Sequence, residues 1–190
     1  MIKTERDAYG QVVVDFHWEK SPLEGEGTCT YLNGDEYRGL FKKGSFNGSG
    51  TYIWKDGGRY EGQWRNSLPH ELGTIHLPNG YKYSGEWKDG TPDGEGTEVC
   101  PDGGRYTGQW KCGKKDGAGE MVFPEGKKYV GGWKEGLQHG KGILYFVDAS
   151  RYEGEWEDNK IFGAGVLIFW DGKRYKGEWV GDKFNGHFDL

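Results

Sequence analysis

The side chains able to do chemistry are few and scattered: five histidines, three cysteines and several short runs of acidic residues. His70 and His139 fall at the same position of a sequence repeat, where other copies carry Glu, Asn, Asp or Phe. A polar loop position explains both. No His-x-x-x-His pair or Cys/His cluster has the spacing of a zinc site. We therefore expect neither a metal nor a cofactor.

Two further patterns suggest catalysis and are better explained by structure. Glu153, Glu155 and Glu157 cluster because the outward positions of one strand are acidic, so a solvated face is a better interpretation than a general acid pair. Gly-x-Gly recurs along the chain, but it opens predicted strands and lacks the lysine and Ser/Thr that phosphate-binding loops require. The sequence predicts that the protein is not an enzyme.

Charge and cysteine content restrict the partners and the compartment. The chain has 25 Lys and Arg against 30 Asp and Glu, a net charge of -5, spread evenly along its length. This distribution predicts no basic stripe for nucleic acid or anionic lipid, although lysines at turns could line one edge after folding. Cys29, Cys100 and Cys112 are odd in number and form no Cys-x-x-Cys pair, which favours reduced thiols in the cytoplasm. No apolar run approaches the length of a membrane span.

The chain repeats with a constant period and without insertion or deletion. Each repeat reads Tyr-x-Gly-x-Trp, followed seven residues later by Gly-x-Gly. The leading tyrosines are Tyr37, Tyr60, Tyr83, Tyr106, Tyr129, Tyr152 and Tyr175; the closing aromatics are Phe41, Trp64, Trp87, Trp110, Trp133, Trp156 and Trp179. An earlier copy survives as Val14-x-Phe16-x-Trp18. A strict period of this length indicates a repeat architecture, in which each copy buries its apolar face against its neighbours.

Within a repeat the pattern predicts two strands. Tyrosine, glycine and tryptophan at i, i+2 and i+4 share one face of the first strand. The second strand is expected to start at Gly-x-Gly and to continue with apolar residues on the same face. Because glycines weaken strands, we expect an aromatic ring from a neighbouring strand to lie over them. Asn-Gly and Asp-Gly pairs such as Asp56-Gly57 predict tight hairpin turns with both residues at positive φ.

The predicted fold class is all-β: an elongated single-layer antiparallel β-sheet of stacked 23-residue β-hairpins. Residues 1–13 are an N-terminal cap or extension, and residues 14–190 form an array of about eight repeats, the first and last incomplete. One layer leaves an aromatic trough partly open, and exposed apolar patches mark interaction sites. The predicted partner-binding groove comprises Tyr37, Tyr60, Tyr83, Tyr106, Tyr129, Tyr152, Tyr175, Trp54, Phe123, Phe146 and Phe169.

The repeat pattern, from Val14 to Gly186, resembles the MORN (membrane occupation and recognition nexus) repeat family. The resemblance implies one hairpin per repeat and a groove along the stacked sheet. Members act as scaffolds in cilia, flagella and parasite cytoskeletal structures and with unconventional myosins, and form accessory regions of lipid kinases, junctional membrane proteins and a lysine methyltransferase. Glu71-Leu72-Gly73 departs from Gly-x-Gly, which leaves the ring contact there open. The last repeat stops at Leu190, and an unpaired edge there predicts association between copies.

We therefore expect a non-enzymatic scaffold or adaptor whose groove binds a helix or extended peptide of a partner protein. The resemblance places it in a cytoskeletal, ciliary or flagellar (axonemal) assembly of a eukaryotic cell. Two alternatives stay open: a peripheral module that binds acidic phospholipids, which the charge disfavours, and the regulatory repeat region of a larger lipid kinase or methyltransferase. Nucleic acid is not an expected partner because stacking platforms come with a positive groove.

Overall fold

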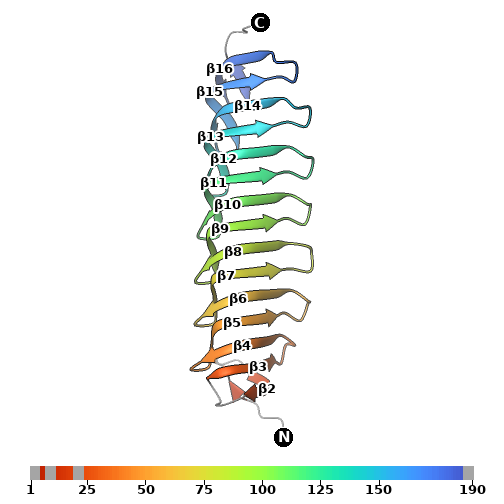
Figure 1. Cartoon of the computed structure of the whole chain (residues 1–190), viewed down its shortest axis with the longest axis vertical. Coiled ribbons are helices and arrows are strands. Elements are labelled where there is room, and N and C mark those ends of the chain that lie inside the picture. Colours follow the sequence, from red (N-terminus) through yellow and green to blue (C-terminus); the bar gives the residue numbers. More distant parts are fainter. Residues whose placement is uncertain (1–4, 7–11, 19–23, 186–190) are drawn as a thin grey trace. The chain divides into compact units, whose positions relative to one another are not determined.

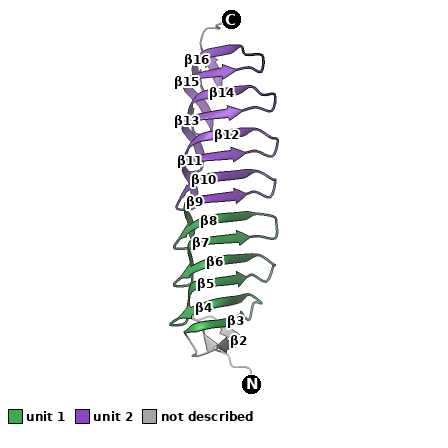
Figure 2. Cartoon of the chain, viewed as in Figure 1, with its two compact units in different colours: residues 1–94 green, residues 95–190 purple. Residues whose placement is uncertain are grey.

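Every regular element of the described structure is a β-strand. The computed structural model describes residues 5–6, 12–18 and 24–185, and this part of the chain contains 17 strands and no helix. The predicted all-β class is confirmed. The chain divides into two compact units, residues 1–94 (unit 1) and residues 95–190 (unit 2), which are described separately (Figure 2).

In unit 1 each strand pairs antiparallel with the next, from β1 to β8 (Figure 1). The strands form one layer of successive hairpins, as predicted. Their bounds are β1 Glu5–Arg6, β2 Val12–Trp18, β3 Gly25–Tyr31, β4 Glu36–Lys42, β5 Ser45–Ile53, β6 Arg59–Arg65, β7 Leu68–His76 and β8 Lys82–Lys88. β9, Thr91–Val99, spans the division between the units.

Unit 2 repeats this arrangement from β10 to β17, again with every strand antiparallel to the next. The bounds are β10 Arg105–Lys111, β11 Lys114–Val122, β12 Lys128–Lys134, β13 Leu137–Tyr145, β14 Arg151–Glu157, β15 Lys160–Ile168, β16 Arg174–Val180 and β17 Lys183–Asn185. Residues 186–190, on which the predicted self-association edge depends, lie outside the described residues.

The core is a ladder of tyrosine and tryptophan rings on one face, here called the aromatic face; the alternate residues form the outer face. β10 shows the pattern, since its side chains alternate strictly between exposed and buried. The ring of Tyr106 lies edge to face between Trp110 (centroids 5.4 Å apart) and Trp133 of the next repeat (5.1 Å). Its hydroxyl donates to the carbonyl oxygen of Gln109 at 2.9 Å. Adjacent repeats therefore share one aromatic core.

The bare glycine backbone beneath a tyrosine ring is confirmed at Gly50, Gly73, Gly119, Gly142 and Gly165. A Cβ built on Gly119 would overlap the ring of Tyr106, and the carbonyl oxygen of the same glycine accepts the indole N–H of Trp133 at 3.3 Å. The second glycine of Gly-x-Gly thus makes room for a tyrosine of its own hairpin. It also accepts a hydrogen bond from the next repeat.

From β5 to β15 the second strands begin three residues before the Gly-x-Gly position, so the predicted start is wrong for them. β11 begins at Lys114, whereas the first glycine is Gly117, at φ +105. Opposite this glycine the register with β10 shifts between Gly108 and Trp110, which marks a bulge. Glycine is needed at the two positions for different reasons. The first glycine adopts a left-handed backbone conformation, and the second leaves space for a ring.

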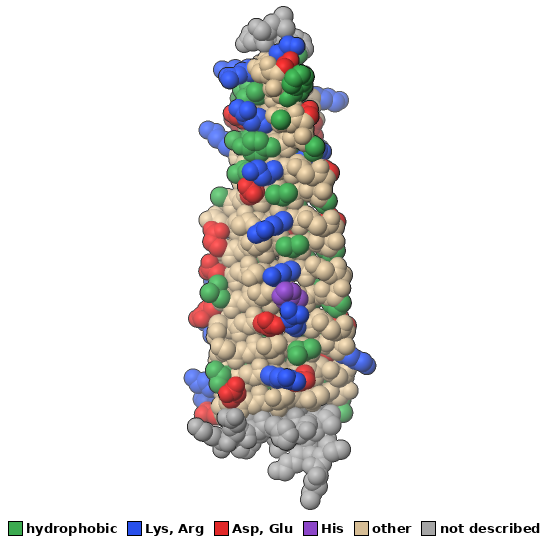
Figure 3. Space-filling model, turned by 45° about the vertical axis from the view of Figure 1, so that its right-hand side comes forward, with side chains coloured by type: hydrophobic (Ala, Val, Ile, Leu, Met, Phe, Trp, Pro, Cys, Tyr) green, Lys and Arg blue, Asp and Glu red, His purple; other side chains and the backbone are tan. Residues whose placement is uncertain are grey.

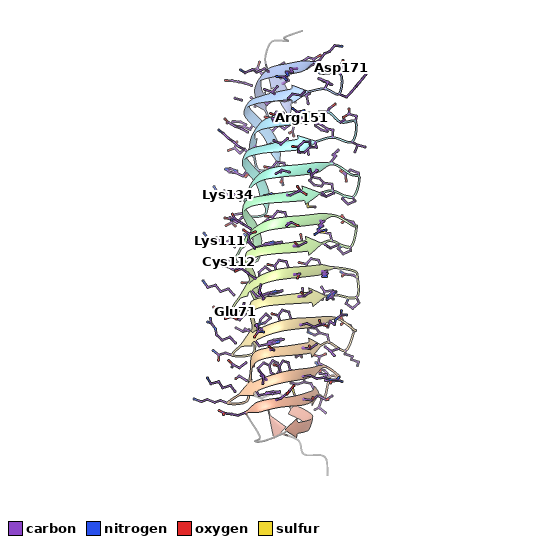
Figure 4. The ribbon with its side chains drawn as sticks, in the orientation of Figure 1. Glu71, Lys111, Cys112, Lys134, Arg151 and Asp171 are labelled. Carbon is purple, nitrogen blue, oxygen red and sulfur yellow. The ribbon has the colours of Figure 1, made fainter. Side chains whose placement is uncertain are left out.

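Glu71, labelled in Figure 4, stands at the first-glycine position of β7 and adopts φ +57. The ring contact left open for this repeat is present, because a Cβ on Gly73 would still overlap the ring of Tyr60. We expect Glu71→Gly to stabilise unit 1 by about 0.5–1 kcal/mol, since glycine removes the left-handed strain at some cost in chain entropy.

Urea unfolding of the two proteins measures this difference. The matched control is Leu72→Gly, at the next residue of the same strand, which is exposed and not at positive φ. That change is expected to destabilise by about 0.5–1 kcal/mol. Equal effects of the two substitutions would show that φ at Glu71 carries no strain.

The Asn-Gly and Asp-Gly pairs lie in turns as predicted, but the turn type differs. Gly57 is at φ +91, whereas Asp56 is not at positive φ, and Gly57 N–H donates to the Trp54 carbonyl oxygen at 2.9 Å. This is a longer loop closed by one left-handed glycine. The two-residue turns with both residues at positive φ lie at the other end of the hairpins, as at Cys112 (φ +48) and Gly113 (φ +79), between β10 and β11.

Candidate functional site

The tyrosines predicted to line the groove are in the core. Six of them are at most 1% exposed: Tyr37, Tyr60, Tyr83, Tyr106, Tyr129 and Tyr152. Tyr175 is half-buried. The six rings pack in the core against neighbouring aromatic rings, and their direct contact with a partner stays a prediction. They form the wall behind the aromatic face, and Tyr60 also lines a pocket on that face.

The other predicted groove residues are accessible. Trp54, Phe123, Phe146 and Phe169 are all half-buried, and each directly follows the end of a second strand. In unit 1, Trp54 helps to form a pocket of about 300 Å³, whose lining also includes Phe46, Tyr52, Pro69 and Ile75. These five residues are called the unit-1 pocket.

Unit 2 carries a corresponding pocket of about 310 Å³. Its lining includes Phe146, Leu144, Gln138 and Ile161, which are called the unit-2 pocket. Each stands four repeats after a residue of the unit-1 pocket, at the same position within its repeat: Gln138 after Phe46, Leu144 after Tyr52, Phe146 after Trp54 and Ile161 after Pro69. The groove is therefore built from fixed positions of the repeat.

Sequence reasoning missed one of these positions, the one that holds Phe46, Pro69, Gln138 and Ile161. These residues lie two before the first glycine of Gly-x-Gly, in a stretch expected to be a loop. The structure places them in the second strand, where the ring of Phe46 stacks on that of Tyr37 at 3.6 Å between centroids. Their varied chemistry hides the position, which alignment of the repeats with one another would locate.

The outer face is different in character. A hollow of about 690 Å³ in unit 1 is lined by polar residues and glycines, among them Thr28, Arg38, Ser49, Thr51 and Gln63. No aromatic side chain lines it. Convergent apolar groups, which small sites and peptide grooves use for anchoring, are therefore found in the aromatic-face pockets and not in this hollow.

Folding also places basic side chains in a column that the even charge distribution did not predict. The residue before each tyrosine is basic in all four hairpins of unit 2: Arg105, Lys128, Arg151 and Arg174. On the outer face they alternate with Val122, Tyr145 and Ile168, and Figure 3 shows basic and hydrophobic side chains in line. Lys128 pairs with Glu120 at 3.5 Å and Arg151 with Glu153 at 2.5 Å, so the column is partly neutralised.

The two histidines of the repeat lie beside the two-residue turns. His70 Nδ1 accepts the backbone N–H of Asp89 at 3.3 Å, and His139 Nδ1 is 3.8 Å from the carboxylate of Asp158. In the part of the chain that the structure describes, no group of three His, Cys, Asp or Glu side chains is placed to bind a metal. The same residues include no helix with the length and apolar content needed to cross a membrane.

Comparison with solved structures finds the same fold at low sequence identity. The TCP domain of SAS-4 (dCPAP) of Drosophila melanogaster, in complex with a proline-rich motif of Ana2 (dSTIL), is 13% identical, with a TM-score of 0.52; the match covers 86% of this chain and 94% of that domain. The TCP10 domain of Danio rerio CPAP is 13% identical, with a TM-score of 0.49, over 93% of this chain and 83% of that one. No curated protein matches the sequence.

The MORN repeat matches the chain eight times in succession. The matched residues are 17–36, 37–59, 60–80, 83–105, 106–128, 129–151, 152–174 and 175–187. These boundaries follow the period of the sequence and cover most of the chain, and the hairpins of both units have the two strands that the repeat implies. The chain therefore belongs to the MORN repeat family.

Proposed function

We propose that this protein is a non-enzymatic scaffold whose aromatic-face pockets bind an extended or helical segment of a partner protein. The observation that carries the proposal is the recurrence of a pocket of about 300 Å³ at the same repeat positions in each unit. Half-buried aromatics such as Trp54 and Phe146 are suitable anchors, because they bury a large area at little cost in side-chain entropy.

A solved structure of similar fold supports a peptide as the partner. The Drosophila SAS-4 TCP domain is described in complex with a proline-rich motif of another protein. At 13% identity the likeness shows the fold alone, so peptide binding by this chain is proposed only by analogy. By analogy with other members of the MORN repeat family, we propose that it serves in a cytoskeletal, ciliary or axonemal assembly of the eukaryotic cytoplasm.

Peripheral binding to acidic phospholipids is a second candidate, favoured by the basic column of unit 2. Each Lys or Arg near an anionic surface contributes about 1 kcal/mol. Two of the four basic residues are already paired with glutamates, and the net charge of the chain is negative. The observation is therefore weaker than the one for the pockets. Co-sedimentation with phosphatidylserine vesicles at low and high salt tests it.

A peptide selection tests the scaffold proposal. The full chain is immobilised and exposed to a library of random twenty-residue peptides, and the selected peptides are labelled for fluorescence anisotropy. Trp54→Ser and Phe146→Ser are expected to weaken binding of the peptides that use each pocket by about 30-fold or more, as for removal of a central aromatic anchor. Both residues lie outside the strands, so the changes leave the sheet pairing intact.

The matched control is Thr51→Ala, which lies in β5 close to Trp54 but on the outer face. Its affinity for the same peptides is expected to stay within about twofold of the unchanged chain. Circular dichroism of each variant establishes that it is folded. Selection of no peptide, or of peptides that bind all three variants equally well, would contradict the proposed function.

A further inference from the structure

Two adjacent hairpins, β8–β9 and β10–β11, place charged residues at positions of the groove that are mainly apolar in the others. Position 115 carries lysine, where the other described hairpins have Phe46, Pro69, Pro92, Gln138, Ile161 and Phe184. Position 98 carries glutamate, where the others have Cys29, Tyr52, Ile75, Met121, Leu144 and Leu167. Both positions line the pockets described above, through Pro69 and Tyr52 in unit 1 and through Ile161 and Leu144 in unit 2. By the repeat, Lys115 and Glu98 therefore occupy groove positions.

The two side chains form an ion pair among aromatic rings. Lys115 Nζ lies 2.8 Å from Glu98 Oε2, and the side chains are only 18% and 13% exposed. The same Nζ is 5.1 Å from the ring centroid of Tyr106 and 5.7 Å from that of Trp133. Rings at this distance hold a cation by their quadrupole. The ammonium is thus fixed in place by aromatic faces, with its charge balanced inside the groove.

The thiol of Cys100 is a third polar group near the Lys115–Glu98 pair. Cys100 stands at the repeat position that holds Trp54 and Phe146 in the two pockets, and it is half-buried. Burial raises the pKa of the Cys100 thiol, and the nearby Glu98 carboxylate adds to the effect. The thiol therefore stays protonated near neutral pH and is a small, weak donor beside the carboxylate. The two hairpins together present a polar site, whereas the unit-1 pocket has aromatic or aliphatic residues at the same repeat positions.

Stability does not explain this ion pair. Replacement of a buried pair by apolar residues of similar volume is often neutral or stabilising, and the other hairpins carry mainly apolar residues at both positions. An ammonium has three N–H donors, of which the contact with Glu98 uses one. The remaining donor capacity suits an oxygen acceptor, the strongest case being a carboxylate.

We infer that Lys115, paired with Glu98, forms a polar subsite of the groove that binds a side-chain oxygen acceptor of the partner segment. The acceptor is the carboxylate of Asp or Glu or the carboxamide of Asn or Gln. A charged contact at groove positions that are mainly apolar in the other hairpins sets the register in which the segment binds, because misalignment leaves the pair buried under apolar side chains. This inference rests on the proposed function.

The repeat also predicts the spacing within the partner. The positions of Glu98 and Lys115 recur two repeats later as Leu144 and Ile161 of the unit-2 pocket. Strands lie about 4.8 Å apart, so two hairpins span about 20 Å. An extended segment covers that distance in about six residues and a helix in about thirteen. The acceptor and the apolar anchor are expected at one of these two separations.

The test compares the peptides selected by the unchanged chain with those selected by the double variant Glu98→Leu/Lys115→Ile. The unchanged chain is expected to enrich Asp, Glu, Asn or Gln at a constant separation from an aromatic or aliphatic anchor. Alanine at that acceptor is expected to weaken binding to the unchanged chain by about tenfold or more. The double variant is expected to lose this discrimination while retaining affinity for the anchor.

Three controls keep the outcomes distinct. Urea unfolding of the double variant is expected to show no loss of stability, and Lys115→Arg is expected to retain the preference for the acceptor. An Asp-to-Asn exchange in the peptide, at two salt concentrations, separates a carboxylate from a carboxamide. Anchored peptides without a recurrent acceptor would overturn this inference and leave the proposed function standing. Peptides whose affinity is unchanged by both Trp54→Ser and Phe146→Ser would overturn the proposed function itself.

Discussion

Replacement of Gly119 by valine is expected to destabilise unit 2 by at least about 3 kcal/mol, the upper range for overpacking a core. A Cβ at this position would lie 2.5 and 2.6 Å from two ring carbons of Tyr106. The ring cannot shift away, because Trp110 and Trp133 enclose it and its hydroxyl donates a hydrogen bond to the carbonyl oxygen of Gln109. Since each repeat is stabilised by its neighbours, part of the core in adjacent hairpins is lost as well.

Urea unfolding followed by circular dichroism and tryptophan fluorescence measures this loss. Ala118→Val is the matched control, because it adds apolar volume one residue earlier in β11 but on the exposed outer face, and its effect is expected within about 0.5 kcal/mol. In the double variant Tyr106→Ala/Gly119→Val the ring that clashes is gone. Its cost is expected to be well below the sum of the two single changes. Additive costs would show that ring and glycine are not in contact.

Alkaline pH is expected to unfold the protein cooperatively, starting soon above pH 10. Burial raises the pKa of five core tyrosines above the ordinary value of 10: Tyr37, Tyr60, Tyr106, Tyr129 and Tyr152, the last to about 12. Above pH 10 the unfolded chain releases phenolic protons that the folded chain retains. Stability from these groups is therefore complete below pH 10 and is lost as pH rises towards their folded-state pKa values.

The expected effect is large. At pH 11 each such tyrosine lowers the free energy of unfolding by about 1.4 kcal/mol, and the five together by about 7 kcal/mol, comparable to the whole stability of many domains. Tyrosinate absorbance and far-ultraviolet circular dichroism, recorded together against pH, should change in one transition. Tyr106→Phe should make that transition less steep by about one proton. Gradual tyrosine ionisation near pH 10 with unchanged circular dichroism would rule out this account.

The structure also changes which residues are candidates for binding. The tyrosines that the repeat pattern makes most conspicuous are core, whereas Phe46, Pro69, Gln138 and Ile161 line the pockets and were not predicted. Trp54 and Phe146 were predicted as groove residues and do line it. Contact of any of these residues with a partner stays a prediction that the peptide selection will test.

Local pattern in the sequence by itself determined the fold class, the hairpin repeat and the face that carries the aromatics. Those features depend on the alternation of side chains along a strand and on the strict period of the repeat, both of which can be read from near neighbours in the chain. The all-β class, the ring-over-glycine contact and the family follow from this level. The start of the second strand was predicted wrongly because the sequence does not distinguish a left-handed glycine at a bulge from a glycine in a regular strand.

The tertiary structure alone decided which rings are covered and which polar groups meet. Tyr106 is fully buried because Trp133, which belongs to the next repeat, closes over it, and Lys115 finds its counterion in Glu98, which belongs to the preceding hairpin. The basic column on the outer face of unit 2 arises in the same way. Burial and ion pairing depend on distances between repeats, and those distances exist only after the hairpins have stacked.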